Sequence, residues 1–537
     1  MFSRSGPAIR VSMTVLLLLL LTLAVGCPRQ AAVPPADQPK QGGEVVIAVG
    51  ASPTSLDPAL QNDWNSFRVV NAMFDRLVQK DDKGNLVPSL ATRWEVAPDG
   101  LTYTLHLRET TFHDGTKFDA HAVKFTFDRH LDPEVGSRYR AWMPEAGLRV
   151  EVVDDRTVRF HLQQIQATFL PIALAEWSSL AVSPTAVQTQ GAAFAQSPVG
   201  TGPFKFKEYV HDSHLLLERN DQYWVGAPYL DTVRIRVIPE ASTRVIEMEA
   251  GNVDILYDVL PRDAQRLEAA GFNVVRGASN RTEFISFNLS REIMSELALR
   301  RAIALAIDRE GIIEHHWLGF AVKARAGAAP YSPYYDDTVP VIEYNVTEAK
   351  RILDEAGWRV GPDGIRQRDG RPLRLEMLAT DRGHWMDMSL VVQDQLRQVG
   401  IDTHLVTLEW GTYLTSWVEG KFDLTFHGQG SFSSDTMDVG IGLDPDGYWN
   451  VHRLNLVETG PMLAIANQLR AMYDELGVTI DLARRKAIVS EIQKLSQDQQ
   501  LAAYLWHPDG LFVLSPDLRD YRIVNQVVYL ERAWLDR

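Results

Sequence analysis

Few residue patterns in this chain point to catalysis or to metal binding. The sequence contains no Gly-x-Ser-x-Gly turn, no His-Glu-x-x-His pair and no Walker loop, so the common nucleophile, zinc and nucleotide motifs are absent. His315 and His316 are adjacent, and His211 and His214 are three residues apart, but neither pair has a carboxylate at the spacing of a metal site. We therefore expect no enzyme activity, no cofactor and no metal site.

Several side chains are better suited to line a ligand pocket. Arg138 and Arg140, close to Trp142, offer guanidinium groups that can hold a carboxylate or phosphate through paired hydrogen bonds, although they also suit a solvated basic helix end. Aromatic walls are a second possibility. The candidates, which could equally be core residues in a chain with 13 tryptophans, are Trp64, Trp385, Tyr413 and Trp417.

A third set of candidates follows a predicted strand at 422–426. His427, Gln429 and Trp449 lie in or beside the segment after this strand. In α/β domains, the loops that follow strands form ligand crevices. We therefore expect these three side chains to line a pocket.

Length and charge limit the classes of protein. With 537 residues, the chain exceeds the size at which one hydrophobic core stops growing, so two or three lobes are expected. The formal net charge of −15 argues against nucleic-acid binding through a basic surface. A single cysteine excludes intramolecular disulfides and cysteine-rich metal sites.

The N-terminal segment has the pattern of a targeting signal. Arg4 and Arg10 precede an apolar run at 13–25 that ends in small residues, which is typical of a signal peptide at 1–26 and too short for a membrane-spanning helix. Cys27 follows, as in a bacterial lipobox, although it could also lie by chance near an ordinary cleavage site. We expect a lipidated Cys27, a Pro- and Gly-containing tether at 27–43, and an extracytoplasmic body anchored to the membrane.

Hydrophobic periodicity predicts the elements of the body. Residues 45–49 read as a buried strand, and 101–107 and 158–162 as half-buried strands, with a helix capped by Asp119 between them. Residues 299–307 and 347–357 predict helices, the second capped by Thr347. Strands at 373–377, 401–408 and 422–426, with a helix before Gly400, favour a second α/β lobe with a largely parallel sheet.

Four stretches resemble the extracytoplasmic solute-binding proteins of ABC importers, family 5, the class that binds oligopeptides, dipeptides and nickel chelates. The stretches follow the family's order along the chain, and each would be a weak signal alone. They are 88–115 (from PSLATRW to FHDG), 200–204 (GTGPF) with 218–224, 287–309 (from FN to AIDR), and 349–357 (AK to LDEAG). Most of these residues suit turns and packing rather than ligand contacts; Gly200 and Gly202, for example, suit positive φ in a tight chain reversal.

The resemblance implies a two-lobed periplasmic-binding-protein-like fold of type II with a third α/β domain. The implied domains are lobe I at 44–80, 198–288 and 504–537, an inserted domain at 81–197, and a second lobe at 289–503. It also implies a monomer that encloses a peptide or similarly sized polar ligand between two lobes by hinge motion and delivers it to ABC permease and ATPase subunits. A sensing or chaperone-like receptor of the same fold is the alternative function.

One family feature is missing. Peptide binders of the family hold the ligand's amino group with an Asp four residues before a Pro; here the matching proline is Pro445 and the residue is Ile441. Asp435 or Asp438 could substitute, and Asp444 could face the pocket or form an ordinary turn. A nickel or other metal chelate is therefore an alternative to a peptide, and Arg140 resembles an arginine of the chelate binders.

Overall fold

The structure is a computed structural model. It describes residues 38–537 except 62, 82–83, 145–146, 278, 280, 331, 382, 431–441, 448–449 and 525. Residues 40–537 form one compact unit. Cys27, the expected signal peptide and most of the expected tether lie outside the described residues. Within the described part, no helix is both long and apolar enough to cross a membrane.

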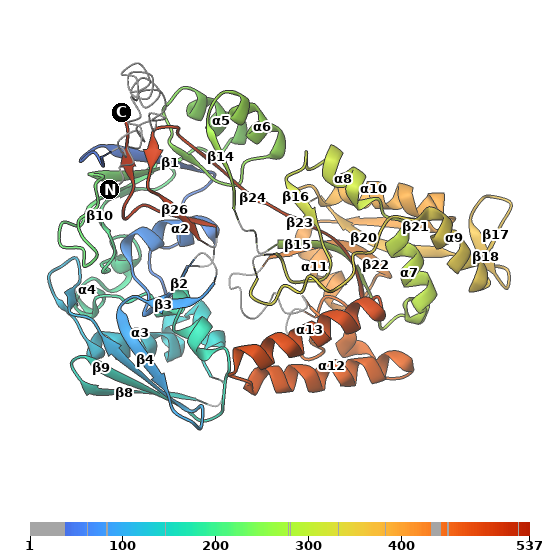
Figure 1. The fold of residues 1–537 in the computed structure, drawn as a ribbon, viewed down its shortest axis with the longest axis horizontal. Coiled ribbons are helices and arrows are strands. Elements are labelled where there is room, and N and C mark those ends of the chain that lie inside the picture. Colours follow the sequence, from blue (N-terminus) through green and yellow to red (C-terminus); the bar gives the residue numbers. More distant parts are fainter. Residues whose placement is uncertain are drawn as a thin grey trace, which may run out of the picture. The chain divides into compact units, whose positions relative to one another are not determined.

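The first sheet joins the two ends of the described chain (Figure 1). Its strand order is β10-β11-β12-β1-β13-β24-β14, and β1 lies parallel to β12 and β13. The predicted strand at 45–49 is confirmed as β1. The strands are β1 (Glu44–Val49), β10 (Phe204–Val210), β11 (His214–Arg219), β12 (Thr232–Val237), β13 (Ile255–Leu256), β14 (Asn273–Gly277) and β24 (Gly510–Leu514), and the accompanying helices are α2 (Trp64–Met73), α5 (Ala241–Glu249) and α6 (Pro261–Ala269). Short pairs close the C-terminal end: β25 (Leu518–Arg519) with β28 (Trp534–Leu535), and β26 (Arg522–Val524) with β27 (Val527–Tyr529).

The inserted domain has its own antiparallel sheet and core. Asp119 caps its main helix as expected, because its carboxylate accepts a hydrogen bond from the N–H of Ala122 at 3.0 Å. The sheet order is β4 (Ala91–Val96), β5 (Thr102–Leu107), β9 (Thr157–Leu162), β8 (Leu148–Asp154), with hairpins β2 (Val78–Lys80)–β3 (Leu86–Pro88) and β6 (Thr110–Thr111)–β7 (Lys117–Phe118). The helices are α3 (Ala120–Leu131), α4 (Pro184–Gln190), η1 (Pro133–Val135), η2 (Arg138–Trp142), η3 (Phe169–Ala173), η4 (Trp177–Ser179) and η5 (Gly191–Ala195).

The second sheet is mixed, which corrects the expectation of a largely parallel one. Only β20, β21 and β22 run parallel, whereas β15, β16 and β23 pair antiparallel. Its order is β16 (Ala321–Lys323), β23 (Ala502–Pro508), β15 (Arg281–Phe287), β22 (Leu424–Gly430), β20 (Arg374–Thr380), β21 (Asp402–Leu408), and a small sheet holds β17 (Arg359–Val360), β18 (Arg366–Arg368) and β19 (Arg371–Pro372). The expected boundaries at 288 and 504 are therefore wrong, because strand pairing places β15 and β23 in this second sheet.

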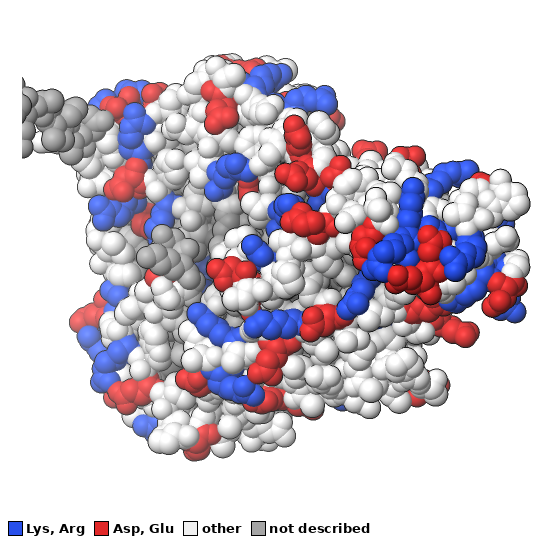
Figure 2. Space-filling model, turned by 45° about the vertical axis from the view of Figure 1, so that its right-hand side comes forward, with Lys and Arg blue, Asp and Glu red and all other residues white. Residues whose placement is uncertain are grey.

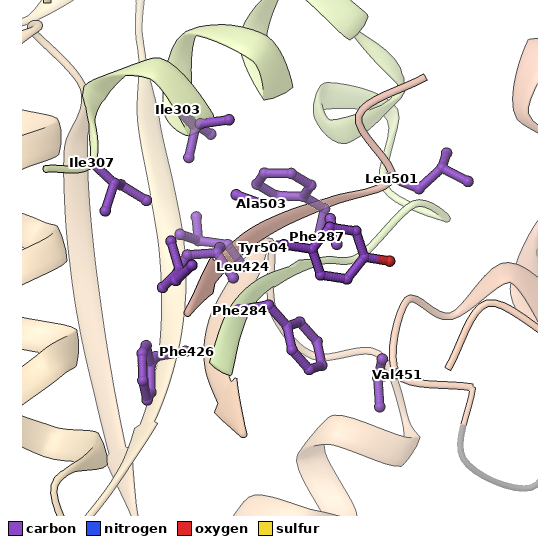
Figure 3. Packing of buried hydrophobic residues seen from close by; sticks show 14 of the residues in the cluster. Phe284, Phe287, Ile303, Ile307, Leu424, Phe426, Val451, Leu501, Ala503 and Tyr504 are labelled. Atoms are coloured by element: carbon purple, nitrogen blue, oxygen red, sulfur yellow. The ribbon is translucent and has the colours of Figure 1, made fainter. Parts of the chain in front are cut away.

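Helices pack against the second sheet and share with it a large hydrophobic cluster. Figure 3 shows Phe284 of β15 beside Tyr504 of β23, with ring centroids 6.1 Å apart, and Phe287 of β15 on the side of Ile303 of α7. The helices are α7 (Leu297–Ala306), α8 (Arg309–His315), α9 (Val346–Glu355), α10 (Trp385–Gln398), α11 (Trp410–Val418), α12 (Pro461–Val478), α13 (Leu482–Asp498), η6 (Glu292–Ser295) and η7 (Leu454–Leu456). Helix α9 begins earlier than expected: its cap is Asn345, not Thr347, because the Asn345 side chain accepts the N–H of Glu348 at 2.9 Å.

The segment around Gly200 and Gly202 connects the inserted domain to the first sheet. Neither glycine has positive φ, so the conformational reason expected for them is wrong. Both are required by close packing instead, since a Cβ on Gly202 would lie 2.5 Å from the carbonyl carbon of Met73 and one on Gly200 would overlap the Met73 carbonyl oxygen.

Charge is distributed without a single-signed region on the face shown in Figure 2, where Lys and Arg side chains interleave with Asp and Glu. Many pairs are direct, such as Arg351 with Glu348 at 2.6 Å and Arg470 with Asp446 at 2.7 Å. A mixed surface of this kind favours solubility over binding to a polyanion.

Candidate functional site

One edge of the second sheet brings several strand ends together. Strands β20, β21 and β22 run parallel, so Thr380, Leu408 and Gly430 end at the same edge. Strand β15 begins there with Arg281, and β23 ends there with Pro508, because both pairings are antiparallel. The carboxyl ends of parallel strands are the usual place for a ligand crevice. We call this region the strand edge.

A buried carboxylate lies at the strand edge. Glu283 of β15 has a fully buried side chain; its Oε1 accepts a hydrogen bond from Nε of Arg281 at 2.5 Å and lies 3.4 Å from Nε2 of His384. Burial alone would raise the pKa of Glu283, but Arg281 and His384 outweigh this effect and hold the pKa below its usual value. Glu283 is therefore an anion at neutral pH.

Space for this carboxylate is provided by a glycine on the neighbouring strand. Gly428 of β22 is the cross-strand partner of Glu283. A Cβ on Gly428 would overlap Oε2 of Glu283 and would lie 2.7 Å from Nη2 of Arg281. The carboxylate therefore occupies the volume that a side chain at position 428 would fill.

Buried polar atoms without hydrogen-bond partners gather at the strand edge. Four adjacent strands contribute them within three residues of the edge: β23 contributes two atoms, and β15, β22 and β20 contribute one each. In the described structure these atoms are Trp506 Nε1, His507 Nε2, Glu283 Oε2, Gln429 Oε1 and Thr380 Oγ1. Since buried polar atoms are normally hydrogen-bonded, their concentration at one edge indicates a site where a further molecule supplies the missing partners.

An aromatic cluster supports the same edge and contains four of the predicted site residues. The ring of Trp385 lies 5.0 Å from that of His427 and 6.2 Å from that of Tyr413. Trp417 stacks on His427 at 5.6 Å, and Trp410 stacks on Tyr413 at 5.5 Å. Tyr413 is fully buried and its hydroxyl lies 3.1 Å from that of Thr425, so it holds neighbouring rings in place rather than offering an open surface.

The sequence missed Trp410 and Glu283. Trp410 is half-buried and starts α11 directly after β21, so its position after a predicted strand was the available signal. For Glu283 the signal was a charged residue inside a strand whose neighbours are apolar or small, since an acidic residue in a core strand is rarely buried without a specific partner.

Other predicted site residues lie apart from the aromatic cluster in the described structure. Trp64 starts α2 and packs edge-on against Phe67 and Trp177, both at 5.8 Å. Arg140 is exposed in η2 and donates to the carbonyl of Leu131. Asp444 accepts the N–H of Asp446 at 3.0 Å in a turn, and burial raises its pKa.

Four predicted residues have no described placement. Asp435, Asp438 and Trp449, like the lipidation candidate Cys27, lie outside the described residues. Among the residues that are described, no group of three or more His, Cys, Asp or Glu side chains could hold a metal ion.

Comparison with known proteins identifies close relatives of the whole chain. The family described as "Bacterial extracellular solute-binding proteins, family 5 Middle" matches residues 85–449. The oligopeptide-binding protein AppA of Bacillus subtilis is 28% identical over 93% of each chain. The structure of AppA with a nonapeptide superimposes with a TM-score of 0.71 and 25% identity, covering 93% of this chain and 100% of that one.

Two further relatives carry different ligands in their names. Heme-binding protein A of Haemophilus influenzae is 28% identical over 89% of each chain. The structure of NikA from Brucella suis, in complex with Fe(III)-EDTA, superimposes with a TM-score of 0.80 and 26% identity, covering 92% of this chain and 100% of that one.

Proposed function

The chain belongs to the bacterial extracellular solute-binding proteins of family 5, and from this premise we propose that it binds a peptide or similarly sized polar ligand at the strand edge and delivers it to an ABC importer. The ligand would be handed to the permease, and separate ATPase subunits would drive transport. The proposal includes a monomeric body tethered through a lipidated Cys27. The family's members are solute-binding proteins, so the proposed role is capture rather than catalysis.

The observation that carries the proposal is the row of unpartnered buried polar atoms at the strand edge of the described structure. Glu283 Oε2 and Gln429 Oε1 are acceptors there, Trp506 Nε1 is a donor, and the hydroxyl of Thr380 can donate or accept. An extended peptide presents N–H and C=O groups alternately along its backbone. A peptide backbone laid along the edge would therefore satisfy donors and acceptors on several adjacent strands.

The anionic state of Glu283 favours a ligand with an ammonium or another strong N–H donor. One oxygen of this carboxylate is already bonded to Arg281, and the other has no partner among the described residues. A hydrogen bond that involves a charged group contributes about 1.5 to 3 kcal/mol, which corresponds to roughly a 10- to 150-fold change in the dissociation constant. This is the contribution expected from Glu283.

Calorimetric titration with peptides of two to nine residues tests the proposal, after native mass spectrometry has identified any co-purified ligand. Glu283→Gln should weaken binding of a free peptide by about 10-fold or more. The same peptide with an acetylated N-terminus should bind both proteins more equally. Glu310→Gln, at an exposed glutamate of α8, is the matched control and should leave the affinity unchanged.

Two results would contradict the proposal. Equal affinities of Glu283→Gln, Glu310→Gln and the unaltered chain would remove Glu283 from the site. Failure of all peptides, together with binding of a metal chelate such as Fe(III)-EDTA, would replace the peptide by a chelate as the ligand.

A further inference from the structure

A second cavity lies between the inserted domain and the α12–α13 hairpin. It has a volume of about 370 Å³, within the range of small-molecule sites. The inserted domain contributes Tyr103, Leu170 and Pro171, and the hairpin contributes Ile480 and Leu482. None of the residues that line it belongs to the strand edge, so the cavity is a separate site.

Direct contacts hold the two walls of this cavity together. The N–H of Ala167 in the inserted domain donates to the carbonyl of Gly477 in α12 at 2.9 Å. The Ile480 side chain packs onto Gly100, where a Cβ would lie 2.6 Å from Cδ1 of Ile480. The cavity is therefore space left inside a packed contact.

The apolar part of the lining is incompletely covered. Leu482 is 51% exposed and Ile480 is 40% exposed, although both line the cavity. Burial of such side chains contributes about 25 cal/mol per Å² of apolar area. An apolar chain placed between Leu170 and these two residues would gain that contribution.

The charged part of the lining is basic. Lys80, Arg485 and Lys486 line the cavity, and no Asp or Glu is among the described lining residues, in a chain whose net charge is −15. The ammonium of Lys80 is already paired with Glu176 at 2.6 Å. Lys486 lies one turn after Leu482 on α13 and makes no ion pair with any described residue.

We propose that this cavity is a second ligand site for a small amphipathic anion, such as a medium-chain carboxylate. The apolar chain lies between Leu170, Pro171 and Leu482, and the carboxylate pairs with Lys486. A molecule bound there contacts both the inserted domain and the helical hairpin, so it also stabilises the contact between Ala167 and Gly477.

Binding of decanoate to the full chain, measured by calorimetry and by displacement of the fluorescent probe 8-anilinonaphthalene-1-sulfonate, tests this site. We expect saturable binding with one decanoate per chain. Lys486→Glu should weaken it at least tenfold, and Leu482→Glu should do the same because it removes apolar area and adds a like charge. Both positions are exposed, so neither substitution should unfold the protein.

Matched controls are Lys350→Glu on α9 and Leu390→Glu on α10, which alter an exposed lysine and an exposed leucine elsewhere; both should bind decanoate normally. The inference is overturned if decanoate does not saturate, if the cavity variants bind as the controls do, or if peptides displace decanoate competitively. Peptide affinity should not change in Lys486→Glu, so this test and that of the strand edge can fail separately.

Discussion

Replacing Gly428 by alanine tests the arrangement of the strand edge. The substitution should destabilise the protein when the Glu283 carboxylate is present and should be neutral or stabilising when that carboxylate is removed. An added Cβ would overlap Oε2 of Glu283 and approach its Oε1 to 2.6 Å. The carboxylate ends a flexible side chain, so it will move before the backbone does. Because the carboxylate is fully buried, moving it breaks its hydrogen bond to Arg281.

The size of the effect follows from two opposing contributions. Loss of the charge-assisted hydrogen bond between Glu283 and Arg281 costs about 1.5 to 3 kcal/mol. Replacement of a glycine by alanine restricts the unfolded chain and stabilises by about 0.4 to 1 kcal/mol. Gly428→Ala should therefore lower the free energy of unfolding by about 0.5 to 2.6 kcal/mol.

A double-mutant cycle separates these contributions. In a Glu283→Ala background the carboxylate is gone, and Arg281, whose side chain is 39% exposed, can turn towards water. Gly428→Ala should then be neutral or stabilising. Thermal unfolding of the four proteins measures both values, and peptide titration should show that Gly428→Ala alone also weakens binding. An equal cost of Gly428→Ala in both backgrounds would refute the packing of Glu283 over Gly428.

Two further predictions concern acid sensitivity and the connection to the inserted domain. Burial lowers the pKa of His130 and of His507 to about 4, so both are neutral in the fold while the unfolded chain takes up protons near pH 6.5. Their contribution to stability is complete above pH 6.5 and is lost as the pH falls from 6.5 to 4, by about 3 kcal/mol for each. Thermal midpoints measured across this range should fall less steeply with pH in His130→Asn and His507→Asn than in the unaltered chain. Unchanged slopes of midpoint against pH would contradict the assignment. Gly202→Ala should destabilise the protein by about 2 kcal/mol or more because the added Cβ meets the backbone of Met73 and Phe74. Gly477→Ala is the control, since an added Cβ there has no atom nearby, and it should not destabilise the protein. Urea unfolding compares the two variants, and an equal effect would show that packing at Gly202 tolerates a side chain.

Features that depend on a few neighbouring residues were predictable from the sequence. The strand at 45–49 and the Asp119 cap are decided by local hydrophobic pattern and by a hydrogen bond three residues away. The cap of α9 was misplaced by two residues because Asn345 and Thr347 both suit a cap, and only the backbone geometry chooses between them. The sequence also did not predict that β15 and β23 belong to the second sheet, because this depends on pairing with strands far along the chain.

The site was only partly predictable for the same reason. His427 was predicted because it follows a predicted strand, and Trp385 and Tyr413 because aromatic rings can wall a pocket; the fold brings the three rings together. Glu283 could not be assigned a role from its spacing, because its partners Arg281 and His384 come from one near and one distant position. The space for its carboxylate depends on Gly428, its cross-strand neighbour, which lies 145 residues further along the chain.

The residues that resemble the family hold the scaffold rather than the ligand. Thr201, Tyr223 and Trp224 all donate hydrogen bonds to the carboxylate of Asp75, at 2.9, 2.9 and 3.0 Å. Burial raises the pKa of Asp75 to about 6 in spite of these donors. The second motif group thus helps to connect the first sheet to the inserted domain. In the third motif group, Arg300 of α7 donates to the carbonyls of Gln499 and Gln500, which fixes α7 in place.

The proposed ligand site at the strand edge uses side chains that these motifs do not include. Glu283, Gln429 and Trp410 lie outside all four motif stretches, and each is at the strand edge. Two relatives of the chain are named for an oligopeptide and for heme, and one fold can serve different ligands when the side chains of its site differ. Substituting Gln429 and Trp410 should therefore change which ligand binds while leaving the thermal midpoint of the protein almost unaltered. Glu283 is left out of this test because loss of its hydrogen bond to Arg281 itself lowers stability. A substitution at Asp75, by contrast, should lower the midpoint without altering ligand preference.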